Sequence, residues 1–196
     1  MRTIGITGNI GSGKSWVCSL FEAQGIPVFY SDEEAKRLYF RQDIRLKMTG
    51  RFGDVVYLDE RTLNKPYLSQ HIFTSEEDRR FVEQTLYPAL NQHFRQWAER
   101  QAAPYVLYES AIIFEKGLRQ MFDAVIMVAA SKETRLRRVM LRDQCSEEDA
   151  MVRMKAQWDE SKKISMADFV IYHQQDNEDG SLLEQIGRID KIIRLT

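Results

Sequence analysis

The sequence predicts an α/β fold built on a parallel sheet of five strands, with a helical insertion and a small helical lid. Three observations carry this prediction. A glycine-rich loop joins an apolar strand to a helix at the start of the chain, and a second strand and helix follow directly. A long helical block comes next. Two strongly apolar segments then resume the strand pattern, as expected of central parallel strands with helices on both faces.

The first forty residues are expected to form two strand–helix pairs. Gly25 is placed to end the first helix, and Ser31 and Glu34 have the spacing of a capping box at the start of the second. The expected elements are a strand at Thr3–Thr7, a helix at Lys14–Gln24, a strand at Pro27–Tyr30 and a helix from Ser31 to about Phe40.

The block from about Gln42 to Arg100 lacks β alternation and contains charged helical segments such as Ser75–Trp97, so it predicts a helical insertion. Ser146 and Asp149 form a second capping-box pattern beyond it. The elements expected after the insertion are strands at Tyr105–Tyr108, Ala124–Val128 and Phe169–Ile171, and helices at Lys132–Arg142, Ser146 to about Lys163, and Ser181–Ile193.

Composition excludes several classes of protein. The 28 Lys and Arg residues nearly balance the 29 Asp and Glu residues, which argues against a protein that mainly clamps nucleic acid. Cys18 and Cys145 lie far apart without a metal-binding pattern, so neither a disulfide scaffold nor a zinc site is expected. No stretch approaches the roughly 20 apolar residues that span a bilayer. We therefore expect a cytoplasmic protein.

The loop after the first strand matches the phosphate-binding pattern G-x-x-x-x-G-K-[ST] through Gly8, Gly13, Lys14 and Ser15. Glycines let successive N–H groups converge on a phosphate, and the following helix adds the positive end of its dipole. A glycine-rich turn with an exposed lysine is the alternative, but the strand before and the helix after favour a P-loop. The residues expected to bind nucleotide through the loop are Gly8, Gly11, Ser12, Gly13, Lys14, Ser15 and the backbone N–H of Trp16.

Other P-loop classes fit less well than a small-molecule kinase. The string Asn64-Lys65-Pro66-Tyr67 lacks the Asp of a GTPase base reader, and only Val106–Glu109 approaches the strand and acid of motor ATPases. A short chain with the loop at its start suits a kinase. Ser15 would ligate Mg²⁺, and Lys14 would reach the β and γ oxygens of ATP. The Trp16 side chain is expected to pack against neighbouring helices.

Such a kinase needs an acid at the acceptor and positive charge at the transferred group. Asp32 follows the second strand, at the edge where α/β sheets bind ligands, although an acid there also stabilises a helix dipole. Arg138 and Arg142 share one helix face. Lid arginines of this kind either offset phosphate charge or form an ordinary solvated face.

Several segments in a fixed order resemble the dephospho-CoA kinase family, and the likeness runs from Ile4 to about Ile171. The segments that carry it are the loop Ile4–Ser15, Ser31-Asp32, Thr62–Lys65 through Leu68, Ile72-Phe73, Tyr87-Pro88, Ile112–Glu115, Arg142-Asp143, Arg153-Met154 with Gln157, and Ala167–Ile171.

The resemblance implies a single P-loop kinase domain over residues 1–196, with an acceptor-binding insertion at about 42–100 and a lid at about 140–163. Asp32 would match the acid that orients and deprotonates the ribose 3′-hydroxyl of dephospho-CoA. Arg142 and Arg138 would approach the nucleotide from the lid, with Arg153 as a further candidate. Lys14, Arg142 and Asp32 are thus the expected catalytic residues.

The chain departs from the family pattern at several positions. Tyr172–Gln175 lacks the Asn-x-Gly segment often used near adenine. The other departures are Asn9 for Gly, Trp16 for Thr or Ser, Lys65 for Arg, Tyr87 for His and Ala111 for Pro.

Two further acidic residues each have two possible roles. Glu115 could lie in the crevice or cap a short helix, and Glu109 could orient Mg²⁺ through water or be a satisfied carboxylate at a strand end. His71, His93 and His173 share no metal spacing and are expected to be ordinary surface or helix residues.

The sequence thus predicts an ATP- and Mg²⁺-dependent kinase of dephospho-CoA, without nucleic acid or membrane partners, that is a monomer or weak homo-oligomer. A kinase of another small acceptor, such as a nucleoside monophosphate, and a nucleotide-binding regulator without catalysis are the alternatives.

Overall fold

The computed structural model describes residues 1–174 and 179–195, which contain a sheet of five strands in the order β2-β3-β1-β4-β5. The predicted all-parallel α/β sheet is confirmed. The central strand β1 pairs with β3 on one side and β4 on the other, and the glycine loop follows it. The strands are β1 (Arg2–Gly8), β2 (Val28–Tyr30), β3 (Tyr105–Glu109), β4 (Ala124–Ala129) and β5 (Phe169–Tyr172).

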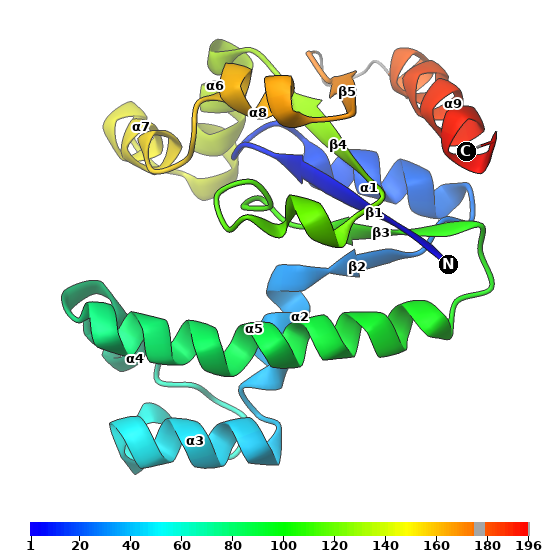
Figure 1. Cartoon of the computed structure of the whole chain (residues 1–196). Coiled ribbons are helices and arrows are strands. Elements are labelled where there is room, and N and C mark those ends of the chain that lie inside the picture. Colours follow the sequence, from blue (N-terminus) through cyan, green and yellow to red (C-terminus); the bar gives the residue numbers. More distant parts are fainter. Residues whose placement is uncertain (175–178, 196) are drawn as a thin grey trace. The chain divides into compact units, whose positions relative to one another are not determined.

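The strand order places helical segments on both faces of the sheet. The step from β1 to β2 runs toward one edge and the steps from β3 to β4 and β5 toward the other, so right-handed connections must lie on opposite faces. Figure 1 shows α1 (Lys14–Ala23) and α9 (Asp179–Leu195) on one side, and α8 (Glu160–Met166) with the segment around η2 (Leu118–Met121) on the other.

Close packing beneath β1 depends on Gly5. A Cβ at this position would lie 2.9 Å from the side chains of both Ile113 and Phe122. The missing side chain therefore lets the segment before β4 pack directly against the central strand. Ile4 and Ile6, which alternate with Gly5 along β1, are fully buried on the other face.

Residues Tyr30–Arg100 form a second compact unit, while Met1–Phe29 and Gln101–Thr196 form the first. The second unit is helical and begins at Tyr30, because α2 packs on α5. The acceptor-binding insertion at about 42–100 falls within this unit and stays a prediction. Within the second unit, Glu34 pairs with His93 at 2.9 Å, which joins α2 and α5. Its elements are α2 (Ser31–Leu38), α3 (Gln42–Phe52), η1 (Asp54–Val56), α4 (Lys65–Thr74) and α5 (Glu76–Glu99).

The expected capping box at Ser31 is wrong. Strand β2 runs directly into α2, so Ser31 is already the first helical residue, and the helix has no side-chain cap. Glu34, the expected partner of Ser31, contacts His93 and Arg37 instead. The second predicted box is present, since the Ser146 hydroxyl accepts a hydrogen bond from the Asp149 N–H at 3.1 Å.

The single helix expected from Ser146 to about Lys163 is also wrong. It is divided into α7 (Glu147–Lys155) and α8, and it follows α6 (Lys132–Asp143). Asp159 caps α8 by accepting a hydrogen bond from the Ser161 N–H at 2.8 Å. This cap lets the backbone leave the helix at Ala156 and start a new one at Glu160, which frees Gln157 and Trp158 for contacts elsewhere.

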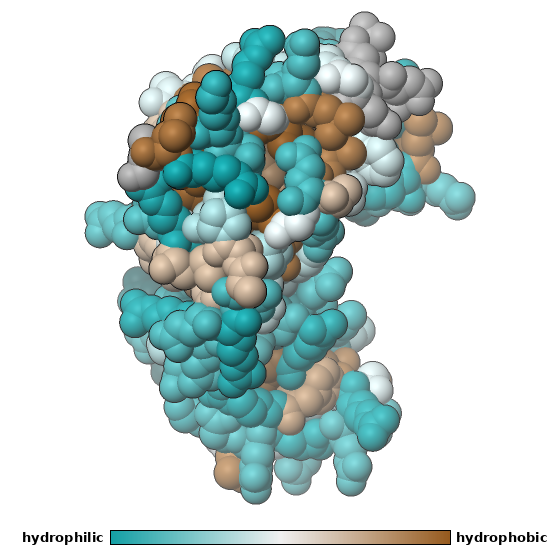
Figure 2. Space-filling model, turned by 90° about the vertical axis from the view of Figure 1, so that its right-hand side faces the viewer, coloured by the Kyte–Doolittle hydropathy of each residue, from teal (hydrophilic) through white to brown (hydrophobic). Residues whose placement is uncertain are grey.

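Large apolar residues reach the surface on separate helices. The face drawn in Figure 2 is mainly hydrophilic, with apolar side chains in limited groups. Among the helices that the structure describes, none has the length and apolar character needed to cross a membrane. Exposed examples are Leu46, Phe73, Leu141, Val152 and Leu195.

A buried ion pair fixes α8 to the segment after β3. The Lys163 side chain is fully buried, contacts the Glu115 carboxylate, and donates a hydrogen bond to the Ala111 carbonyl at 3.0 Å. Glu115 is therefore neither a helix cap nor free in the crevice. Removal of one charge from a buried pair leaves the other uncompensated, which is far more costly than loss of both.

We expect Lys163→Met to lower the free energy of unfolding by about 3–5 kcal/mol in urea denaturation, because Glu115 is left buried and unpaired. The double variant Lys163→Met with Glu115→Leu should recover most of this loss. Arg188→Met removes an exposed pair with Glu184 and should change stability by only about 0.5 kcal/mol. Equal losses for Lys163→Met and Arg188→Met would contradict the buried pair's role.

Candidate active site

The glycine loop leaves β1 at Gly8 and enters α1 at Lys14. Helix α1 has no side-chain cap within the described residues and no acid in its first turn, so its positive dipole end meets no carboxylate there. Gly13 precedes the helix with φ of 83°, and Gly11 has φ of 79°. Both backbones adopt left-handed conformations that suit glycine. The arrangement fits an anion at the helix N-terminus.

Close neighbours are a second reason why glycine is required in this loop. A Cβ at Gly11 would overlap the backbone carbonyl of Arg135, and a Cβ at Gly13 would overlap the His173 ring. The Ser12 hydroxyl lies only 2.5 Å from the position of a Cβ at Gly8. The loop is thus closely surrounded by α6 and by the residue after β5, and no side chain larger than hydrogen fits at these three positions.

Lys14 contacts the carboxylate of Glu109 at the end of β3. Both side chains are largely buried, with 14% of Lys14 and 8% of Glu109 exposed. Glu109 is therefore a satisfied carboxylate at a strand end, which was one of its two interpretations. One turn further along α1, burial raises the pKa of the Cys18 thiol to about 12, so this thiol stays protonated and unreactive at neutral pH.

Arg138 lies against the loop. Its Nη1 donates hydrogen bonds to the carbonyls of His173 at 3.1 Å, Ser12 at 3.3 Å and Gly11 at 3.4 Å. The structure thus brings together Arg138, Gly11 and Ser12 from the predicted nucleotide-binding set. The guanidinium thus holds the carbonyls of Gly11 and Ser12 and fixes the loop backbone on this side.

Arg142, one turn further along α6, has a different environment. It is bidentate to Asp143 at 2.7 and 3.0 Å, and Arg153 reaches the same carboxylate at 2.8 Å. Hydrogen bonding from Arg142 holds the pKa of Asp143 below its ordinary value, and Arg153 adds to this effect. The Arg142 side chain is 62% exposed. Its expected catalytic role remains a prediction.

Val17, Cys18 and Phe21 form the buried face of α1, and the neighbouring Trp16 is 48% exposed. Its expected packing against neighbouring helices stays a prediction. Ser15, the residue before Trp16, is exposed. Asp32 belongs to the second unit, where it is exposed in the first turn of α2.

One of the three histidines differs from expectation, whereas His71 and His93 are helix residues as expected. His173 is not a surface residue: it is 6% exposed and packs against Gly13. Its position after a parallel strand was the signal for this, since such residues gather at one edge of the sheet. His71 pairs with Asp78 at 3.3 Å and His93 with Glu34 at 2.9 Å, both within the second unit.

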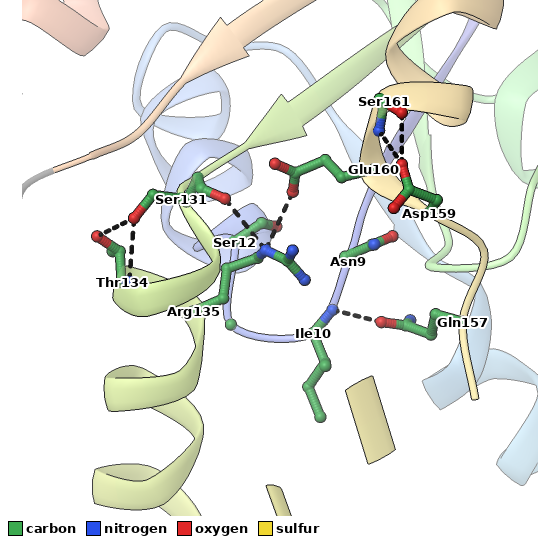
Figure 3. A network of polar contacts seen from close by, with 12 residues as sticks. Asn9, Ile10, Ser12, Ser131, Thr134, Arg135, Gln157, Asp159, Glu160 and Ser161 are labelled. Carbon is green, nitrogen blue, oxygen red and sulfur yellow. Dashed lines mark hydrogen bonds and ion pairs between the residues drawn. The ribbon is translucent and has the colours of Figure 1, made fainter. Parts of the chain in front are cut away.

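Sequence reasoning missed a set of residues that hold the loop from outside. The Gln157 side chain accepts a hydrogen bond from the Ile10 N–H at 2.7 Å (Figure 3). The Asn9 side chain donates one to the Trp158 carbonyl at 3.0 Å. Arg135 pairs with Glu160 at 3.1 Å beside them. Asn9 was noted only as a departure and Gln157 only as part of a family pattern. Their contacts depend on the break between α7 and α8.

The segment that departs from the family pattern near adenine is only partly described. Gln174 follows His173, and its side chain accepts a hydrogen bond from the Ser131 N–H at 2.9 Å, which joins it to the start of α6. Gln175 lies outside the described residues.

A magnesium ion fits this loop through the nucleotide rather than through a protein cage. Among the described residues, no group of three or more His, Cys, Asp or Glu side chains could hold a metal. Ser15 offers one exposed hydroxyl at the start of α1. Mg²⁺ commonly takes one or two protein ligands and fills its octahedron with phosphate oxygens and water. The Ser12 hydroxyl, buried without a hydrogen-bond partner in the described part of the chain, suits a phosphate oxygen.

A parallel five-stranded sheet, a glycine turn after its central strand, and a lysine and serine at the helix start are the features of a P-loop kinase. Comparisons with known proteins narrow this class. The family model for dephospho-CoA kinase matches residues 2–179. The chain belongs to the dephospho-CoA kinase family.

Individual relatives agree with this assignment. Dephospho-CoA kinase from Bacteroides fragilis is 38% identical over 170 residues, which cover 86% of this chain and 82% of the relative. The crystal structure of TT1252 from Thermus thermophilus is 31% identical, with a TM-score of 0.86 over 97% of this chain and 96% of that one. Dephospho-CoA kinase from Campylobacter jejuni, at 22% identity, shares the fold with a TM-score of 0.69 over 99% and 98% of the two chains.

We expect Gly13→Ala to lower the melting temperature and to weaken ADP binding, measured by thermal unfolding and calorimetric titration. The left-handed backbone alone costs about 1–2 kcal/mol with a Cβ, and the overlap with His173 adds to it. Gly25→Ala is the matched control, because its φ of 79° is similar but no atom lies within 4 Å of the added Cβ.

Gly25→Ala should therefore lower the melting temperature less and leave ADP binding unchanged. Combining Gly13→Ala with His173→Ala should recover the part of the loss in melting temperature and ADP affinity that the overlap with His173 causes. If Gly13→Ala and Gly25→Ala behave alike and His173→Ala gives no recovery, His173 does not restrict the loop.

Proposed function

We propose that this chain transfers the γ-phosphate of ATP to the ribose 3′-hydroxyl of dephospho-CoA, which yields coenzyme A and ADP. The observation that carries the proposal is a complete phosphate loop, with Lys14 and Ser15 in place, in a chain of the dephospho-CoA kinase family. The N-terminal end of α1, with its positive dipole and no acid in its first turn, would supply the anion site.

Lys14 and the loop amides would hold the β- and γ-phosphates. For this, Lys14 exchanges the Glu109 carboxylate for phosphate oxygens, and a long flexible side chain permits the exchange. The Ser15 hydroxyl would ligate Mg²⁺, which supplies positive charge against the developing charge on the phosphates. Arg138 would support nucleotide binding through the loop carbonyls that it holds.

Asp32 would accept the proton of the 3′-hydroxyl and orient that oxygen toward the γ-phosphate. The support for this role is that Asp32 follows the last residue of β2 by two positions and is exposed in the first turn of α2. In open α/β sheets, ligands bind beyond the carboxyl ends of the strands. The second unit, Tyr30–Arg100, would bind the rest of dephospho-CoA, and Arg142 in the lid would offset charge on the transferred group.

The proposal includes a cytoplasmic enzyme that is a monomer or weak homo-oligomer. Among the described residues, the exposed apolar side chains are scattered and form no large patch on one element, which supports a monomer. Size-exclusion chromatography with light scattering would test the oligomeric state.

Asp32→Asn is expected to lower kcat about 10²- to 10⁴-fold while the KM for ATP stays within about threefold, because general-base catalysis acts at the transition state. Steady-state kinetics with Mg-ATP and dephospho-CoA would measure both values. Glu33→Gln removes the neighbouring acid from the same first turn and is the matched control for the helix dipole. Near-normal kcat in Asp32→Asn, or an equal loss in Glu33→Gln, would remove Asp32 from the base role.

The acceptor itself can be tested with a panel of hydroxyl and phosphate acceptors, scored by ADP release. We expect turnover with dephospho-CoA. With nucleoside monophosphates kcat/KM should be at least 100-fold lower, because an acceptor that makes fewer contacts stabilises the transition state less. Lys14→Ala should abolish release with every acceptor. Turnover with a nucleoside monophosphate but not with dephospho-CoA would overturn the proposal, and so would ATP binding without any transfer.

A further inference from the structure

We propose that Gln157 and Asn9 position the phosphate loop, by joining its first limb to the residues between α7 and α8. We call the four residues that meet there, Asn9, Ile10, Gln157 and Trp158, the loop clamp. The inference rests on the proposed function only in that this loop binds ATP; it is independent of the acceptor.

The clamp consists of two hydrogen bonds in opposite directions. The Gln157 side-chain oxygen accepts from the Ile10 N–H at 2.7 Å, and the Asn9 side-chain nitrogen donates to the Trp158 carbonyl at 3.0 Å. Figure 3 shows Gln157 pointing toward Ile10 beneath the start of α8. Asn9 is 4% exposed, so its bond is shielded from water. These contacts join residues about 150 positions apart in the sequence.

The clamp acts on the turn that opens the loop. The Ser12 N–H donates to the Asn9 carbonyl at 3.0 Å, and Gly11 has positive φ at the third position, as a type II turn requires. In such a turn the N–H of the second residue, here Ile10, has no partner within the turn. Gln157 satisfies this N–H with an uncharged oxygen and so fixes the orientation of the first peptide of the turn.

The clamp is itself held firmly. Asp159 caps α8 directly after Trp158, and Lys162 lies over the Trp158 ring at 3.4 Å. On the other side of the turn, the Arg135 carbonyl packs against Gly11, and the Arg135 side chain pairs with Glu160 at 3.1 Å. The turn is therefore fixed from both sides by one connected set of residues.

Gln157 is thus a positioning residue, which acts on the phosphates through the loop. A loop that is already ordered loses less conformational freedom when ATP binds, and so gains affinity. Loss of one intramolecular hydrogen bond of about 1 kcal/mol corresponds to a roughly fivefold weaker complex. We expect an effect on KM and Kd of this size, with little effect on kcat at saturating ATP.

The test compares Gln157→Leu, which removes the acceptor, with Gln157→Glu, which keeps an oxygen at the same reach. Lys132, Arg135 and Lys155 line the cavity beside Gln157 together with Asp159 and Glu160, so one added negative charge is balanced there. ADP binding is measured by calorimetry, and exchange of the Ile10 amide hydrogen by NMR. Gln157→Leu should weaken ADP binding about three- to tenfold and speed the exchange, and Gln157→Glu should restore both.

Tyr105→Phe is the matched control for stability. It removes a 2.8 Å hydrogen bond from Tyr105 to Asp190. Tyr105 lies at the start of β3, beside the first residue of β1, whereas the loop follows the last residue of β1. Tyr105→Phe should lower the melting temperature without changing ADP affinity. If Gln157→Leu lowers the melting temperature but binds ADP as the unaltered chain does, Gln157 is only structural and the proposal is wrong.

If Gln157→Leu does not fold, Asn9→Ala tests the other bond of the clamp, with the same expected direction for ADP affinity and Ile10 exchange. Unchanged values in Asn9→Ala would then overturn the proposal. Because both measurements need no acceptor, failure of the clamp is distinguishable from failure to phosphorylate dephospho-CoA, which the acceptor panel reports.

Discussion

The conformation of one short turn, Asn9 to Gly13, is the constraint on which its surroundings depend. Its backbone groups find partners on the protein side of the loop: Arg138 donates to the carbonyls of Gly11 and Ser12, and Gln157 accepts from the Ile10 N–H. The backbone must also pass beneath α6 and His173 without side chains, which makes two glycines with positive φ necessary. The residues around this turn therefore act together to stabilise a single backbone conformation.

Charge around the loop is arranged in pairs. Lys14 meets Glu109, Arg135 meets Glu160, and Lys163 meets Glu115, and in each pair both side chains are mostly buried. Burial raises the pKa of Glu160, while the nearby Arg135 opposes that shift. Pairing keeps each buried charge compensated. It also fixes α6, α8 and the end of β3 against the loop, so electrostatics and packing reinforce each other at the same place.

Most of the sheet could be predicted from the sequence, because strands such as Ala124–Ala129 are continuous apolar runs bounded by polar residues. The loop and its helix followed from a motif with a fixed geometry. The break at Gln157–Asp159 was missed because helix-favouring residues continue through it, although Asp159 followed by Ser161 was a usable cap signal. The clamp and the burial of His173 depend on contacts between distant segments, which no local pattern encodes.

Asp143 holds two arginines at the surface, whereas Glu109 holds its lysine in a buried pair. Exposed pairs are weak and are screened by dissolved ions, while buried pairs are nearly insensitive to them. In the proposed reaction, Arg142 and Arg153 would therefore leave Asp143 for phosphate oxygens readily, and Lys14 would leave Glu109 only at a greater cost. Ionic strength should then act on how quickly the nucleotide is captured far more than on how firmly its phosphates are finally held.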